Sequence, residues 1–181
     1  QLRENKKTRY MINASLKYQL FDWLDVVGRV KIDNYDNRST YKAYASTGTL
    51  VSGDRGTYSD TSTQSKNTYA DAIATLNKSF NDWSVNVNLG VSLSDSRYEM
   101  IGYEGGLKLI NFFAVHNIDF NKAWKAKQSG WHDQTRAIFA NAEIGWKSMI
   151  YLTATGRNDW DSRLAFSDYK SFFYPSIGLS A

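Results

Sequence analysis

Two histidines are the side chains of this chain best suited to acid–base chemistry or metal binding. They are His116 and His132, and neither has a partner at the H-x-x-x-H spacing that places two ligands on one metal ion. Both fall in one long polar stretch without the turn that presents a nucleophilic serine, so no Ser-His-Asp arrangement is indicated. The chain has no cysteine, which excludes disulfides, thiol chemistry and cysteine-bound metals.

Carboxylates are the other groups that could do chemistry. Asp159 and Asp161 flank Trp160 and share one face of a predicted strand end, and such pairs hydrolyse glycosides, although a solvated rim is the more typical use. Residues 33–37 (Asp-Asn-Tyr-Asp-Asn) offer oxygen ligands for calcium. They lack the glycine and the terminal glutamate of an EF-hand loop and are typical of an Asx-rich turn. We therefore expect no catalytic residue, no metal and no cofactor, and predict that the chain is not an enzyme.

The clearest pattern in the chain is the alternation between Trp83 and Ser94. Apolar side chains occupy every second position from Trp83 to Leu93, and Ser, Asn and Gly lie between them. Successive side chains of a strand point to opposite faces, so this segment is one strand with an apolar face and a polar face. Its length of about 12 residues is twice that of an ordinary strand but suits a tilted strand that crosses a bilayer. Small polar residues opposite aliphatic ones predict a transmembrane β-barrel, with the aliphatic side chains facing lipid.

Similar segments along the chain predict about seven strands. Their ranges are residues 9–21, 25–33, 67–80, 83–94, 135–146 and 150–160, with a last strand that begins near Phe172. Very short turns near Asp22, Asp82 and Lys147 alternate with long polar connections at residues 35–66, 98–134 and 161–171. Outer-membrane barrels have this asymmetry, so we expect the three turns at one edge of an antiparallel sheet and the long loops at the other.

The composition agrees with a barrel and excludes other classes. Of 181 residues, 42% are hydrophobic, the mean hydropathy is -0.51, and no run approaches the roughly 18 apolar residues of a helical membrane span. Aromatic residues make up 15%, and Trp23, Trp83 and Trp146 lie at the short turns, as expected of an interfacial girdle. The net charge of +4 is too small to indicate nucleic acid binding.

Two neighbouring segments carry a more specific pattern. Residues 156–162 (Gly-Arg-Asn-Asp-Trp-Asp-Ser) are followed, after a short loop, by residues 172–180 (Phe-Phe-Tyr-Pro-Ser-Ile-Gly-Leu-Ser). This pair closely resembles a strand–loop–strand signature of SusC/RagA-like TonB-linked (TonB-dependent) outer-membrane transporters. The hairpins with an Asp-Trp turn resemble the barrel of the same family, so the resemblance covers essentially the whole chain.

The resemblance implies a 22-stranded barrel in the outer membrane of a Gram-negative bacterium, a plug domain inside it and a SusD-like surface lipoprotein over its mouth. It also implies uptake of oligosaccharides or peptides, driven by the inner-membrane TonB complex. Residues 1–181 show no plug-like segment, no TonB-contacting box and no signal segment, and about seven strands cannot close such a barrel.

We therefore expect one partial domain, an antiparallel up-and-down transmembrane β-barrel segment of the all-β class, paired with the remainder of the same barrel and its plug. Its role would be to build the barrel wall and part of the substrate vestibule. Two alternatives are a complete small outer-membrane barrel that serves as an adhesin or scaffold, and a soluble carbohydrate-binding β-sandwich.

Two sets of side chains outside the predicted strands could contact a partner or a substrate. An apolar run in a polar loop needs a surface to cover, either neighbouring loops and the plug or the lipoprotein lid, and it contains Leu109, Ile110, Phe112 and Phe113. Four loop aromatics could stack on sugar rings or peptide side chains, namely Tyr103, Trp124, Trp131 and Trp160. The basic residues Arg3, Lys6, Lys7 and Arg9 are interpreted as a solvated strand end rather than a site for lipopolysaccharide phosphates.

Overall fold

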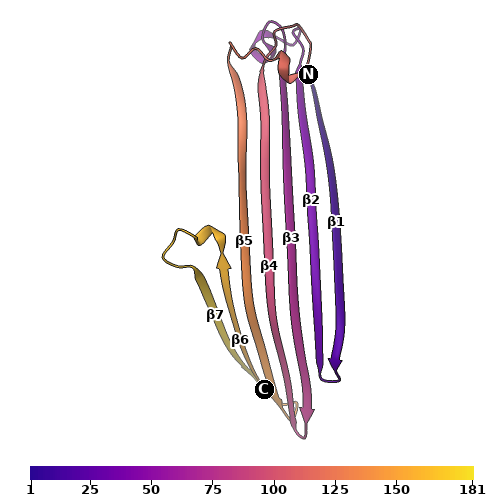
Figure 1. Ribbon diagram of the computed structural model, residues 1–181, viewed down its shortest axis with the longest axis vertical. Helices are drawn as coiled ribbons and strands as arrows, with labels where there is room; N and C mark the ends of the chain where they lie inside the picture. Colours follow the sequence, from indigo (N-terminus) through magenta and orange to yellow (C-terminus); the bar gives the residue numbers. More distant parts are fainter. The chain divides into compact units, whose positions relative to one another are not determined.

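The computed structural model describes residues 1–181, leaving out the side chains of residues 49 and 51. Seven strands form a single sheet in chain order, as Figure 1 shows. They are β1 (Leu2–Phe21), β2 (Leu24–Ala43), β3 (Thr57–Phe80), β4 (Trp83–Gly106), β5 (Trp124–Trp146), β6 (Ile150–Asp161) and β7 (Ser171–Ser180). The predicted all-β, antiparallel up-and-down fold is therefore confirmed.

Three short helices occupy the connections: α1 (Thr49–Ser52), η1 (Val115–Asn117) and η2 (Ser162–Leu164). Within the part of the chain that the structure describes, no helix has the length and apolar character needed to cross a membrane.

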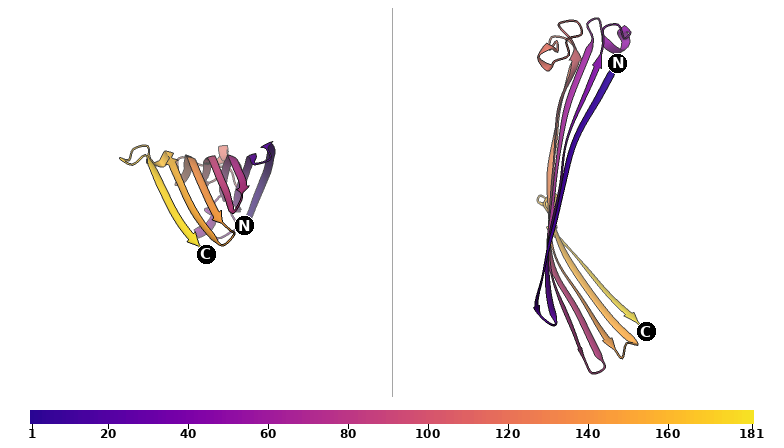
Figure 2. Two further views of the ribbon diagram at one scale, coloured as in Figure 1. Left: turned by 90° about the horizontal axis from the view of Figure 1, so that it is seen from below. Right: turned by 90° about the vertical axis from the view of Figure 1, so that its right-hand side faces the viewer.

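The chain divides into two compact units. Unit 1 comprises Gln1–Tyr10, Asn34–Lys66 and Arg97–His132, and unit 2 comprises Met11–Asp33, Asn67–Ser96 and Asp133–Ala181. Parts of β1 to β5 belong to each unit, whereas β6 and β7 lie in unit 2. Figure 2 shows the strands of unit 2 as one layer. The segment of β1 in unit 2, residues 11–21, has about the length of a strand that crosses a bilayer.

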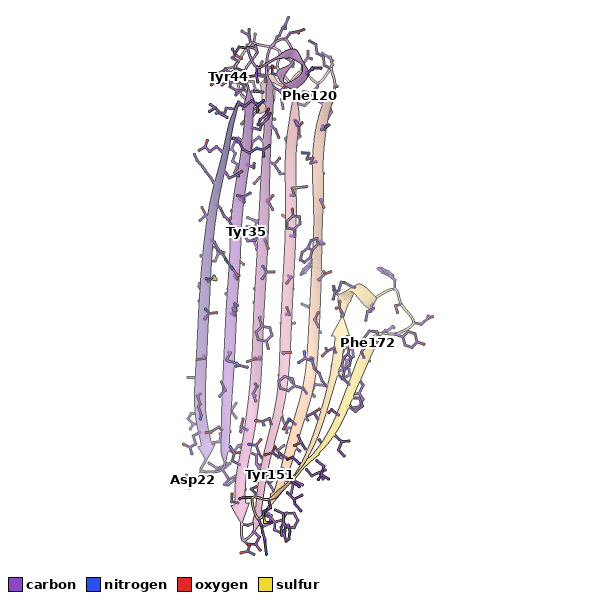
Figure 3. All side chains as sticks on the ribbon, turned by 180° about the vertical axis from the view of Figure 1, so that it is seen from behind. Asp22, Tyr35, Tyr44, Phe120, Tyr151 and Phe172 are labelled. Atoms are coloured by element: carbon purple, nitrogen blue, oxygen red, sulfur yellow. The ribbon has the colours of Figure 1, made fainter. Side chains whose placement is uncertain are left out.

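The three short turns lie at one edge of unit 2, as predicted. The backbone N–H of Asn77 donates to the carbonyl of Trp23 (2.9 Å), and that of Lys147 donates to the carbonyl of Asp82 (2.7 Å). Asp22 and Tyr151, beside two of these turns, are labelled at the same end of unit 2 in Figure 3. Asn81 adopts a left-handed φ of 51° in the β3–β4 turn, a conformation that Asn tolerates better than most residues.

Two of the three predicted long loops are mostly strand, so this part of the prediction is wrong. β2 continues to Ala43 and β3 begins at Thr57, while β4 continues to Gly106 and β5 begins at Trp124. These extensions mix polar and apolar residues on both faces, so they lack the apolar–polar alternation by which a strand is recognised. Their many Thr and Tyr residues favour strand, and the paired strands beside them continue the hydrogen-bonded ladder. The third loop, between β6 and β7, lies where it was predicted.

The register of the last hairpins fixes which side chains share a face. Trp146 pairs with Ile150 and Ala140 with Gly156 between β5 and β6, and Tyr151 pairs with Ser180 between β6 and β7. β1 and β7 are the two ends of the sheet, so the sheet is open. Since all seven strands belong to one sheet, the two-sheet sandwich alternative does not fit.

Candidate functional surfaces

The polar face of unit 2 is held together by side-chain pairs between neighbouring strands. Arg29 donates two hydrogen bonds to Asp71, and the Tyr69 hydroxyl donates to the same carboxylate (2.9 Å). Thr75 donates to Asn88 (2.8 Å). Further pairs on this face join Asn86 to Asn77, Lys17 to Asp25, and Thr153 to Glu143. These pairs place the predicted polar positions of β1 to β4 together on one face, and the prediction for these positions is confirmed.

The opposite face of unit 2 is apolar and exposed. Leu16 and Ile177 retain 76% and 77% of their surface, values that are unusual for aliphatic side chains of a folded domain. The other exposed aliphatic residues at these alternate positions include Leu89, Val91, Ile138, Ile144, Leu152 and Leu179. Such a continuous apolar surface on a sheet requires a covering layer of lipid or protein.

A loop layer packs on one face of unit 1. Leu107, Ile118 and Tyr58 form its buried core, with Phe113 and Val115 packed against them. The buried Asn117 side chain binds the loop backbone, because its amide accepts from Leu109 N–H (3.0 Å) and donates to the carbonyls of Leu109 (2.9 Å) and Phe112 (2.7 Å). Figure 3 shows Tyr44, from the connection after β2, and Phe120, from the connection before β5, at the same end of unit 1.

The apolar run that the sequence singled out is divided by this layer. Leu109 and Ile110 are each 64% exposed and Phe112 is 50% exposed, so these three form an apolar patch. Phe113 turns inward, with its ring 4.9 Å from that of Tyr44. Only three of the four predicted residues therefore lie on the surface.

The four predicted aromatic residues lie in strands, and the structure does not bring them together as one site. Tyr103 belongs to β4 and packs against the core of the loop layer, while Trp160 is near the end of β6 in unit 2. Trp124 opens β5 and makes an edge contact with Phe120 (4.9 Å). Trp131 stacks on Tyr98 of β4 with 6.0 Å between ring centroids. Trp131, which is 47% exposed and stacks on Tyr98, is the best aromatic platform among them.

One ion pair in unit 1 is not predicted by the sequence. Arg38 of β2 donates two hydrogen bonds to Asp60 of β3 (3.0 and 2.6 Å), and these hold the pKa of the Asp60 carboxyl below its ordinary value. Burial raises the pKa of the neighbouring Tyr58 hydroxyl, with a further contribution from the Asp60 charge. Arg38 and Asp60 lie far apart in the sequence, and only the pairing of β2 with β3 reveals the contact.

The residues considered for catalysis are engaged in local contacts. His116 packs edge-on against Phe112, Arg157 binds Asp159 (2.7 Å), and Arg163 binds Asp161 (2.5 Å). Among the side chains that the structure describes, no group of three or more His, Cys, Asp or Glu residues could hold a metal ion.

Comparisons with known proteins identify the fold. No family model and no curated protein matches the sequence. Among solved structures, the RagAB peptide transporter matches 98% of this chain with 15% identity and a TM-score of 0.85. The RagAB peptide importer in its closed-closed state gives 14% identity over 98% of this chain and a TM-score of 0.87. In both cases the match covers 20% of the RagAB chain, so the chain spans about a fifth of the length of these transporters.

A more distant match is the siderophore receptor PiuA from Acinetobacter baumannii. It has 12% identity and a TM-score of 0.56, over 97% of this chain and 29% of the receptor. The resemblance that the sequence indicated is thus confirmed at the level of the fold: the chain folds like part of the RagAB transporters and, less closely, like part of the PiuA receptor.

Proposed function

We propose that the chain is part of the barrel of an outer-membrane nutrient importer. One observation carries the proposal: a single sheet that matches the RagAB transporters over nearly its whole length also separates an exposed aliphatic face from a hydrogen-bonded polar face. In this role the aliphatic face contacts lipid, and the polar face lines the lumen around a plug. The free edges of β1 and β7 pair with further strands of the same barrel.

Unit 1 supplies the extracellular end and part of the substrate vestibule. The substrates are peptides or oligosaccharides, import is driven through the TonB complex, and the barrel lies in the outer membrane of a Gram-negative bacterium. Tyr103, Trp124, Trp131 and Trp160 remain candidates for substrate contacts. Trp131 is the strongest of these candidates, because it is 47% exposed and stacks on Tyr98.

The exposed patch of Leu109, Ile110 and Phe112 is the proposed contact for a SusD-like surface lipoprotein. Its three apolar side chains protrude from a loop whose backbone is fixed by Asn117, so a partner binds them without first ordering the loop. The RagAB peptide transporter contains a part with the same fold as this chain.

The import proposal is tested with the full-length protein in the bacterium that carries it. We expect the protein in the outer-membrane fraction and expect a protonophore to abolish uptake of a labelled peptide mixture. Uptake that is unchanged by deletion of the gene would contradict the proposal.

The lipoprotein contact is tested by replacing Leu109 and Ile110 with Asp. This change should abolish co-purification of the surface lipoprotein while leaving the barrel folded. Leu50→Asp is the matched control, because Leu50 is also an exposed leucine of a unit 1 connection but lies outside the patch. Equal loss in the control would refute the assigned patch.

A further inference from the structure

One face of unit 1 can be traced across five strands from side-chain contacts. Arg3 of β1 lies over the Tyr41 ring of β2 (5.6 Å), and Lys7 lies over Tyr35 (4.3 Å). Thr61 of β3 and Gly102 of β4 share this face, because a Cβ built on Gly102 would lie 2.7 Å from the Thr61 hydroxyl oxygen. Lys127 of β5 pairs with Glu104 of β4 (3.4 Å), and Trp131 stacks on Tyr98. Alternation along each strand extends this assignment, and we name the surface the basic face.

The strand charges of unit 1 are distributed unequally between its two faces. The basic face carries five cationic side chains and a single carboxylate, that of Glu104; the cations are Arg3, Lys7, Arg9, Lys125 and Lys127. The opposite face carries five cations and four carboxylates. Each of those carboxylates has a bound partner: Glu4 with Lys6, Asp36 with Gln64, Asp60 with Arg38, and Glu99 with Arg97.

The loop layer packs on part of the opposite face and leaves the basic face open. A Cβ on Gly105, at an alternate position of β4 on the opposite face, would meet Ile118 and Trp124, and Lys42 there lies over Phe113. On the basic face, Trp131 is 47% exposed. The charged pairs of the opposite face remain exposed as well, so the two faces differ in the balance of their charges and not in their access to dissolved molecules.

Three cations of the basic face have no carboxylate partner among the residues that the structure describes. Arg3 and Lys7 rest on tyrosine rings, which attract cations without neutralising them, and Lys125 has no ion pair. Unbalanced charge of one sign on such a surface raises the local concentration and the association rate of solutes of the opposite charge.

We propose that the basic face selects acidic peptides among the substrates of the importer; this inference rests on the proposed function. Carboxylates would meet Arg3, Lys7 and Lys125, and a side-chain ring or the peptide plane would stack on the Tyr98–Trp131 pair. β1 and β5 are separated by four strand spacings, a distance of about 19 Å. An extended peptide of roughly six residues has this length. An acidic peptide of six residues or more is therefore long enough to engage both cationic borders at once.

The experiment uses the full-length protein in detergent and three labelled decapeptides of one design, in which the same positions hold Asp, Asn or Lys. The variant replaces Arg3, Lys7 and Lys125 with Gln. Its matched control replaces Lys6, Lys66 and Arg97, three cations of the opposite face, with Gln. Association rates are measured by stopped-flow fluorescence at low and high salt.

We expect the native protein to bind the Asp peptide fastest, and the variant to lose about tenfold in association rate for that peptide alone. The loss should vanish near 1 M salt, where the Debye length is about 3 Å, and the control should keep the native rate. Equal rates for the three peptides, or an equal loss in the control, would overturn the inference while leaving peptide import intact. An oligogalacturonate that binds faster than the Asp peptide, with the same dependence on Arg3, Lys7 and Lys125, would also overturn the assignment to peptides. Failure to bind any peptide would instead count against the proposed function.

Discussion

Arg29 of β2 holds the carboxylate of Asp71 of β3 through two hydrogen bonds of 2.8 and 2.7 Å, and this carboxylate is 1% exposed although its partner is half exposed. A carboxylate so far removed from water depends on its cation, because an uncompensated buried charge is costly. The pair joins two strands of the polar face of unit 2.

Replacing Arg29 with Gln should therefore lower the free energy of unfolding by more than the control described next, since the Tyr69 hydroxyl is then the one donor left to Asp71 among the described side chains. The measurement is a denaturant titration of the full-length protein in lipid vesicles. Arg97→Gln is the control: its pair with Glu99 is exposed on both sides and should contribute about 0–1 kcal/mol. Adding Asp71→Asn to the Arg29 variant should recover most of the loss, and equal losses in variant and control would contradict the argument.

Leu89 and Asn88 are adjacent residues on opposite faces of β4, and they test which face meets lipid. Leu89→Arg should cost about 2–4 kcal/mol, because it places a charge near the middle of the bilayer. Asn88→Arg should cost far less, because Asn88 lies on the polar face with Thr75. Folding into lipid vesicles measures both, and equal destabilisation would refute the assignment of the faces.

Gly90 is required because the ring of Phe139 lies across it on the polar face. The Arg157 guanidinium lies over the same ring, 5.6 Å from the ring centroid. A methyl group at position 90 would overlap this ring, so Gly90→Ala should destabilise the protein by about 1–3 kcal/mol. Gly28→Ala of β2 is the control, because a Cβ there meets nothing within 4 Å. It should be neutral or slightly stabilising in the same titration, and a loss equal to that of Gly90→Ala would show that backbone freedom, not the ring, sets the requirement.

Asn117 fixes the loop that carries the Leu109, Ile110 and Phe112 patch. Asn117→Ala leaves one N–H and two carbonyl groups without their partner, which should cost about 1–3 kcal/mol locally. We expect faster amide hydrogen exchange in residues 107–119 and faster tryptic cleavage after Lys108. Asn121→Ala, at an exposed position of the same connection, should leave both rates unchanged.

Unit 1 should lose stability in acid through Asp60. Its pKa is lowered in the folded state by the hydrogen bonds from Arg38, so its contribution is complete above the unfolded value of about 3.9 and is lost as the pH falls through the folded pKa. Asp60→Asn should cost about 1 kcal/mol at pH 7, a small value because Arg38 is largely exposed. The difference between native and variant protein, followed by hydrogen exchange in β2 and β3, should shrink below about pH 4. A difference that grows in acid would contradict the assigned direction.

The strands of unit 2 and their two faces follow from the amino-acid sequence alone. The alternation of Val85, Leu89 and Val91 with Asn86 and Asn88 is a local property, since the geometry of a single strand assigns its side chains to faces without reference to the rest of the chain. The turns near Asp22, Asp82 and Lys147 are equally local, and the Arg-Asn-Asp-Trp signature pointed to the fold that the structural comparison recovered.

The extensions of the strands and the contacts between them could not be predicted from the sequence and are seen in the folded chain alone. The strand segments of unit 1 have no regular apolar–polar alternation, so neither their extent nor the location of Trp131 in a strand follows from hydrophobic periodicity. The inward turn of Phe113 and the pairs Arg29–Asp71 and Arg38–Asp60 depend on inter-strand register. The segregation of charge onto the basic face also depends on inter-strand register, because register determines which residues of neighbouring strands lie side by side. Register is set by pairing between residues that are far apart in the chain.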